Sequence, residues 1–160
     1  LIPLTLILTG SPFLVGYAKP VPVRFDRLRN PRIDSIWVAL AGPGSNLVQA
    51  FLWAILLICL AGFQVQEQFL ISVAQAGIRW NLVLLVFNLF PLPPLDGGRI
   101  LASMLPARQS IAFGKIEPWG FFIVLALVFT GIIGSLWMNP LMSFFQKILY
   151  FITMPLQILF

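Results

Sequence analysis

The sequence predicts an all-α protein, a polytopic bundle of transmembrane helices. Of its 160 residues, 59% are hydrophobic and 9% are charged, whereas about a quarter of the residues in a soluble domain are charged. Two uncharged stretches, Ser35 to Gln66 (32 residues) and Pro118 to Gln146 (29 residues), exceed the roughly 20 apolar residues that cross a bilayer as a helix. Both are continuous apolar runs without the alternation of barrel strands, so helices are the structure that satisfies their backbone in lipid.

The apolar segments define the expected spans of a single transmembrane domain, residues 1–160. Residues 1–16 are interrupted by prolines and a glycine, which suggests the end of a membrane segment. Further spans are predicted at residues 35–63, 69–92 and 119–137, and residues 139–160 form a last apolar helix that either spans the membrane or lies in its interface. Arg79 beside Trp80 indicates an interfacial anchor, because a charge at mid-bilayer costs about 2.5–3.5 kcal/mol. The third helix is therefore expected to begin near Ala76.

The net charge of +5 is explained by orientation in the membrane. Loop 19–34 carries a net charge of +3 and loop 106–117 a net charge of +1, and the hairpin between them returns both to one side. Basic loops are retained on the cytoplasmic side. Membrane lipid is therefore an expected partner, and no nucleic-acid partner is indicated.

The single cysteine and the start of the chain carry less information. Cys59 lies in an apolar run, so the chain can build neither a disulfide framework nor a thiolate zinc site. The chain begins at Leu1 without an initiator methionine or a basic leader, so no signal peptide is recognised. We expect the sequence to be incomplete at its N-terminus.

The most informative segment reads N-L-F-P-L-P-P-L-D-G-G-R at residues 88–99, between two apolar stretches. Its three prolines lack backbone donors and exclude the residues before them from the helical conformation, so the helix must unwind. Irregular backbone at membrane depth is tolerated only where protein or a water-filled cavity surrounds it. The break therefore predicts a site.

Asp96 follows this break. If the next segment is helical, Asp96 lies about 18 Å from Arg108 along the helix axis, inside the cytoplasmic half of the bilayer. An intramembrane carboxylate must be neutralised, paired or bound to a metal, and it usually marks function. In the simpler interpretation, Asp96 only caps a helix that begins at Gly97, with Arg99 as a nearby counter-charge. The asparagine and prolines upstream favour a site.

Three segments carry a resemblance to one family. Residues 88–97 match the pattern N-x-x-P-x-P-x-L-D-G, residues 41–46 (A-G-P-G-S-N) match A-G-P-x-x-N, and residues 16–23 (G-Y-A-K-P-V-P-V) match G-x-A-K-P-V-P-V. Together they resemble the site-2 protease family of intramembrane zinc metallopeptidases, the last of them its compact prokaryotic members. The matches extend from about Gly16 to Arg99.

The resemblance implies an enzyme of a prokaryotic cell membrane that hydrolyses peptide bonds of membrane-spanning protein substrates. In the family, two histidines of an H-E-x-x-H helix bind Zn²⁺, its glutamate is the general base, and the aspartate corresponding to Asp96 completes the ligand set. Three protein ligands leave a position for water, which the metal acidifies. Asn88 is expected to donate a hydrogen bond to the carbonyl oxygen that becomes an oxyanion, or else to bond to backbone freed at the break.

The chain departs from the family because it contains no histidine. The two histidine ligands and the catalytic glutamate would have to precede Leu1, so the chain would be the C-terminal portion of a larger protease core. Alone, it is expected neither to hold catalytic zinc tightly nor to cleave. The small residues of segment 41–46 are expected to permit close helix packing, with Asn46 as an interhelical hydrogen-bonding group. Segment 16–25 could offer an edge to an extended substrate.

Two other function classes stay open. Asp96 beside a broken helix also fits an ion- or proton-coupled transporter, and a membrane scaffold could keep the fold without the metal. Other intramembrane protease chemistries are excluded for this chain. A serine-histidine dyad lacks its histidine, and a paired-aspartate site lacks a second membrane-embedded carboxylate, since the remaining acids fall in predicted loops: Asp26, Asp34, Glu67 and Glu117.

Overall fold

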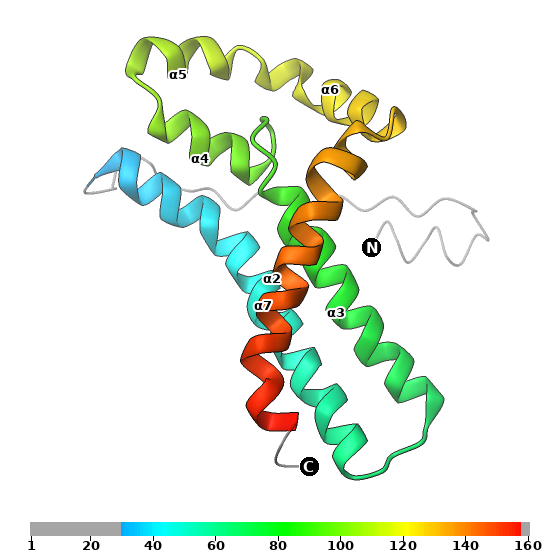
Figure 1. Ribbon diagram of the computed structural model, residues 1–160. Coiled ribbons are helices and arrows are strands. Elements are labelled where there is room, and N and C mark those ends of the chain that lie inside the picture. Colours follow the sequence, from blue (N-terminus) through cyan, green and yellow to red (C-terminus); the bar gives the residue numbers. More distant parts are fainter. Residues whose placement is uncertain (1–29, 158–160) are drawn as a thin grey trace, which may run out of the picture.

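The computed structural model describes residues 30–157, and every regular element in that range is a helix. Two long helices form a hairpin, α7 packs against both, and α4 to α6 gather at one end (Figure 1). The elements are α2 (Pro31–Gly62), α3 (Gln68–Asn88), α4 (Asp96–Met104), α5 (Ala107–Gly114), α6 (Glu117–Phe129), the π-helical η2 (Gly134–Met138) and α7 (Asn139–Gln157). The first predicted segment, most of the basic loop and the motif at 16–23 lie outside the described residues.

The α2–α3 hairpin agrees with the second and third predicted spans. Both helices are long and apolar enough to cross a bilayer. Pro31 starts α2, where its missing N–H is not needed, and the Asn30 N–H donates to Asp34 Oδ2 at 3.1 Å. The expected start of the third helix near Ala76 is wrong. The helix begins at Gln68, because no proline or glycine interrupts residues 68–76.

The core holds the hairpin and α7 together. Its fully or nearly fully buried members are Ala50, Leu82, Leu85 and Val86. Lower in the hairpin, a Cβ on Gly77 would collide with the indole ring of Trp53, so the glycine permits α2 and α3 to approach closely. From the C-terminal part of the chain, Trp137 Nε1 donates to the Val86 carbonyl at 2.9 Å.

Two expectations for the C-terminal half are wrong. The predicted loop 106–117 contains α5, because the residues after Pro106 include good helix formers and a proline is tolerated where a helix starts. The predicted span 119–137 is not one helix. Its first part, α6, ends at Phe129, Gly131 has a φ of +73°, and η2 follows. Helices α5 and α6 bend by 66° and are a third candidate span only when taken together.

Candidate functional site

The break between α3 and α4 covers residues 89–95, as the prolines predict. Two short backbone bonds close it locally: the Leu92 N–H donates to the Phe90 carbonyl at 2.8 Å, and the Leu95 N–H to the Leu92 carbonyl at 3.0 Å. Pro91, Pro93 and Pro94 have no N–H to donate. The chain therefore turns compactly between two helices.

Helix α4 begins at Asp96, directly after the break. Its N-cap residue is Leu95, and no side chain caps the helix. The interpretation in which Asp96 merely caps a helix that starts at Gly97 is therefore not what the structure has. The carboxylate lies in the first helical turn, where the helix dipole favours a negative charge, and it is not used to satisfy a backbone N–H of α4.

Three glycines allow the helices to touch the break. A Cβ on Gly97 would collide with the Leu89 and Phe90 backbone, and one on Gly98 with the backbone of Leu92 and Pro93. On α6, a Cβ on Gly120 would meet the Pro93 carbonyl. The break is thus clamped between α4 and α6 by direct backbone contact.

The second motif meets Asp96 from α2. Residues 41–46 lie inside α2 as regular helix, with Pro43 buried. A Cβ built on Gly42 would lie 3.1 Å from Asp96 Oδ2, whereas one on Gly44 would meet nothing within 4 Å. The Asp96 carboxylate therefore abuts Gly42, which agrees with the expectation that the small residues permit close packing. Asn46 is half-buried, and its side chain makes no hydrogen bond to another of residues 30–157.

Asn88, the last residue of α3, lies at about the same depth in the hairpin as Gly42. Gly77 of α3 packs on Trp53 of α2, so these two residues lie at the same level of the hairpin. Asn88 is eleven positions after Gly77 in α3, and Gly42 is eleven positions before Trp53 in α2. Because α2 and α3 run antiparallel, Asn88 is level with Gly42. Its Nδ2 donates to the Leu84 carbonyl at 2.9 Å, and no hydrogen bond joins it to Asp96. The amide keeps its second N–H and its oxygen available.

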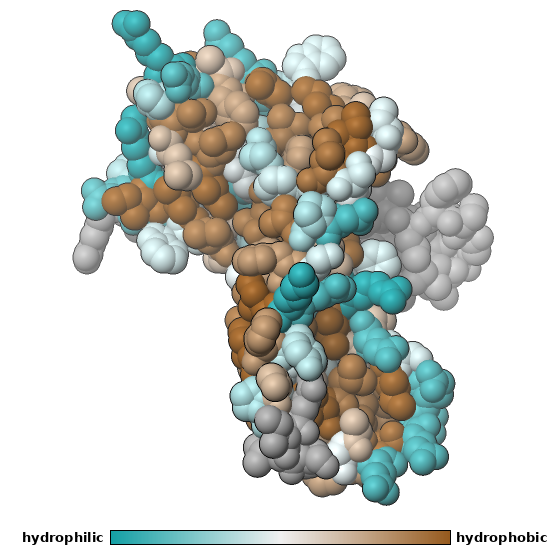
Figure 2. All heavy atoms as spheres, in the orientation of Figure 1, coloured by the Kyte–Doolittle hydropathy of each residue, from teal (hydrophilic) through white to brown (hydrophobic). Residues whose placement is uncertain are grey.

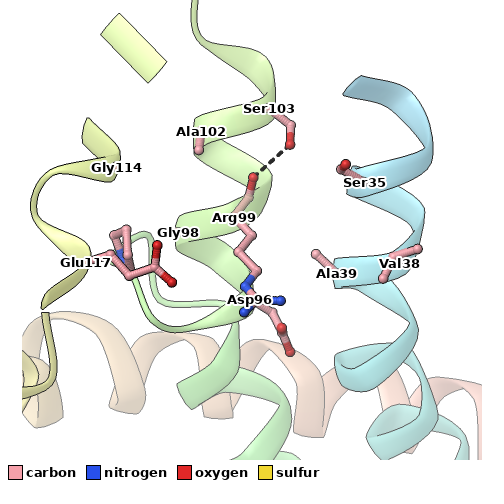
Figure 3. Close-up of a pocket in the computed structure, with 11 residues that line it drawn as sticks. Ser35, Val38, Ala39, Asp96, Gly98, Arg99, Ala102, Ser103, Gly114 and Glu117 are labelled. Carbon is pink, nitrogen blue, oxygen red and sulfur yellow. Dashed lines mark hydrogen bonds between the residues drawn. The ribbon is translucent and has the colours of Figure 1, made fainter. Parts of the chain in front are cut away.

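A cavity of about 360 Å³ opens beside Asp96, between α2, α4 and the start of α6. Figure 3 shows Arg99 extending along α4 toward Asp96 and Glu117 on the other side of α4. Polar side chains on its wall are Ser35, Asp96, Arg99, Ser103 and Glu117. The cavity gives the carboxylate a polar surrounding that an isolated Asp in lipid would lack.

Sequence reasoning missed two residues of this site. Gly120 of α6 and Glu117 at its start come from a segment read as a loop and a simple span. The signal that the sequence did offer was Gly120 itself, because a single glycine within an apolar helix often marks a place where another backbone packs closely. Nothing in the sequence indicated which element the glycine would meet.

The described residues do not supply a complete metal site. Within residues 30–157 no group of three or more His, Cys, Asp or Glu side chains could hold a metal ion, and the sequence has no histidine at all. A catalytic zinc site needs three protein ligands. Asp96, in the first turn of α4 and facing a cavity, fits one of them.

Comparisons with known proteins agree on one family. Residues 63–131 match the model of "Peptidase family M50". The chain is 36% identical over 133 residues to the Bacillus subtilis protein named "Putative zinc metalloprotease YwhC", covering 80% of this chain and 60% of that protein. Two mycobacterial proteins with the same description are also similar. Rip3 of Mycobacterium tuberculosis is 32% identical over 112 residues (63% of this chain, 28% of Rip3), and Rip2 of Mycolicibacterium smegmatis 37% over 95 residues (58% and 35%).

The chain spans about 60% of YwhC and a smaller share of the two mycobacterial relatives. No solved structure gives a significant match. The match to the family model includes α3, the break with Asp96, α4 and α6, which are the elements that build the site. The chain belongs to peptidase family M50, the site-2 protease family.

Proposed function

We propose that this chain contributes Asp96 as one protein ligand to the zinc ion of an intramembrane metalloprotease, whose other ligands lie outside these 160 residues. The complete protein would hydrolyse peptide bonds of membrane-spanning substrates. Its basic loops would face the cytoplasm of a prokaryotic cell. The 160-residue chain alone, with one ligand, would be inactive.

One observation carries the proposal: the two motif segments that resemble the family meet at the Asp96 carboxylate. Gly42 comes from the middle of α2 and Asp96 from the start of α4, and the carboxylate abuts the glycine. A carboxylate held at a helix start beside a cavity is available to a cation. An unpaired acid at membrane depth would otherwise be costly.

Asn88 is proposed to act on the substrate. Its side chain lies at the depth of Gly42 and retains one N–H after bonding to the Leu84 carbonyl. That N–H could stabilise the oxyanion formed from the substrate carbonyl. The bond to Leu84 would hold the amide in place for this task.

The test uses the complete parent protein, purified from membranes, with a membrane-spanning substrate. Asp96→Ala should abolish cleavage while membrane insertion and yield stay normal. Asn88→Ala should lower kcat by about 10²- to 10³-fold, as removal of one oxyanion donor does, with zinc content unchanged. Undiminished cleavage by Asp96→Ala would end the proposal, and zinc loss in Asn88→Ala would reassign Asn88 to a structural role.

A further inference from the structure

Helix α3 carries four polar side chains on one face of its N-terminal half. Gln68, Ser72, Gln75 and Arg79 follow at spacings of four, three and four residues, so they stack along one side of the helix. All four are exposed. We call them the α3 polar stripe, and it is about 16 Å long. Figure 2 shows hydrophilic side chains along the outer edge of this half of α3.

The stripe lies at a depth where the neighbouring helix is apolar. Gly77 of α3 packs on Trp53 of α2, and the α2 residues beyond Trp53, from Ala54 to Gly62, are apolar without exception. If Arg79 marked the membrane surface, this part of α2 would stand in water. The stripe therefore begins beside the polar turn at Gln68, which donates to Ser72 Oγ at 3.3 Å, and it reaches into the apolar depth of the hairpin at Gln75 and Arg79. Uncovered polar side chains at that depth are costly and usually functional.

Arg79 has no partner in the described part of the chain. No hydrogen bond or ion pair joins its side chain to another of residues 30–157. The described carboxylates are remote. Asp96 lies beyond the other end of α3, and Glu67 precedes α3 by one residue, about 18 Å from Arg79 along the axis. The cation is thus available to a carboxylate from elsewhere.

A cavity of about 220 Å³ lies between α2, α3 and α7, and its lining contains no residue of the stripe. Ile78, next to Arg79, lines it from α3, and the polar wall comes from α7 through Gln146, Tyr150 and Thr153. Toward the site, α7 and η2 close over α3, where Trp137 bonds to the Val86 carbonyl. The α3 polar stripe is therefore confined to the half of the hairpin remote from Asp96.

We propose that the α3 polar stripe is the docking surface for a membrane-spanning helix of another protein, and that this helix places a carboxylate against Arg79. Polar side chains join helices in lipid by hydrogen bonds, and charge complementarity selects an acidic partner. The inference does not depend on Asp96 or on zinc.

A second copy of this chain fits the surface less well. Two copies inserted with the same orientation and related by a twofold axis along the membrane normal would bring their α3 helices together in parallel. Arg79 would then face Arg79, and like charges repel. Residues 1–29 contain one acid, Asp26. It comes four residues before Asn30, whereas Arg79 lies about 30 Å along α2 from Pro31, so Asp26 is too far away to supply the partner charge.

The experiment places a photo-crosslinking amino acid at position 75 of the complete protein, in the membranes of the organism that makes it. Val73, exposed on another side of the same turn, is the matched control position. Crosslinked peptides are identified by mass spectrometry. We expect an adduct with an apolar segment of another protein that contains Asp or Glu, at least tenfold more abundant from position 75 than from position 73.

The charge is then tested on both partners. Arg79→Leu should lower the adduct yield about tenfold and Arg79→Lys should retain it, and changing the partner's carboxylate to an amide should lower it as much as Arg79→Leu. Accumulation and melting of Arg79→Leu should match the parent, because the side chain is exposed and makes no hydrogen bond or ion pair with another described residue. An adduct with lipid only, with the same chain or with a second copy would overturn the proposal, as would a yield that Arg79→Leu leaves unchanged.

Discussion

Two proline-containing segments lie close together at the site, and they have opposite structures. Pro43 sits inside α2 and leaves the helix continuous, whereas Pro91, Pro93 and Pro94 end α3 and open the chain for seven residues. One proline removes one backbone donor, which a transmembrane helix tolerates. Three within four positions remove too many donors for the helix to continue. The continuous segment therefore packs beside the Asp96 carboxylate, and the broken segment sets the position of that carboxylate.

The largest expected effect comes from filling the contact between α4 and the break. Gly98→Ala would drive a Cβ into the Leu92 and Pro93 backbone, and backbone cannot rotate away. We expect a loss of about 3 kcal/mol in the free energy of unfolding, measured by denaturant titration in detergent. Gly114→Ala, whose Cβ would meet nothing within 4 Å, should change stability by less than about 0.5 kcal/mol. Equal effects would mean that the break is not clamped by α4.

Gly120→Ala tests the second side of the clamp. The added methyl would displace α6 from the Pro93 carbonyl, with an expected cost of about 2 kcal/mol. The cost should be smaller than for Gly98→Ala, since α6 is a separate helix that can shift as a unit. Melting temperature and protease sensitivity of the break both report it. If the Gly120→Ala protein were as stable as the parent, α6 would not pack against the break as described.

The contact between Gly42 of α2 and the Asp96 carboxylate is tested by Gly42→Ala in the complete protein. A Cβ at 3.1 Å from Asp96 Oδ2 forces the carboxylate aside by a few tenths of an ångström. Zinc affinity is expected to fall about tenfold, the scale of changes around a metal ligand, with little change in stability. Gly44→Ala, with open space around its Cβ, is the matched control. Unchanged affinity in Gly42→Ala would separate Asp96 from the metal.

The smallest effect is expected where α7 meets α3. Trp137→Phe removes the hydrogen bond to the Val86 carbonyl and keeps an aromatic ring near Phe90. The expected loss is about 1 kcal/mol in the free energy of unfolding. Zinc affinity should not change, because neither Trp137 nor Val86 lines the cavity beside Asp96. A change in zinc affinity would show that α7 also shapes the site.

The sequence predicted the parts of this site that depend on local chemistry. Prolines 91, 93 and 94 determine where α3 stops, and the hydrophobic runs locate α2 and α3. The spans after the break could not be read in the same way, because a continuous apolar run contains no signal for the bend between α5 and α6 or for the turn at Gly131.

The tertiary contacts of the site could not be predicted from the sequence either. Gly42 was assigned to a packing motif, but its contact with Asp96 depends on the register of α2 against α3. Gly120 was not singled out, since its partner is a carbonyl group 27 residues earlier in the chain. Asn88 and Asp96 lie in one sequence segment, and the roles of Asp96 as a zinc ligand and of Asn88 as a group that acts on the substrate stay predictions.

The most direct test of the account is the zinc content of the complete protein carrying Asp96→Asn, compared with Asp34→Asn. Asp34 is an acid at the start of α2 that accepts the Asn30 N–H, so its loss controls for removing a charge. We expect about one zinc per molecule for the parent and for Asp34→Asn, and a large loss of zinc for Asp96→Asn with normal insertion. Full zinc occupancy at unchanged affinity in Asp96→Asn would contradict it.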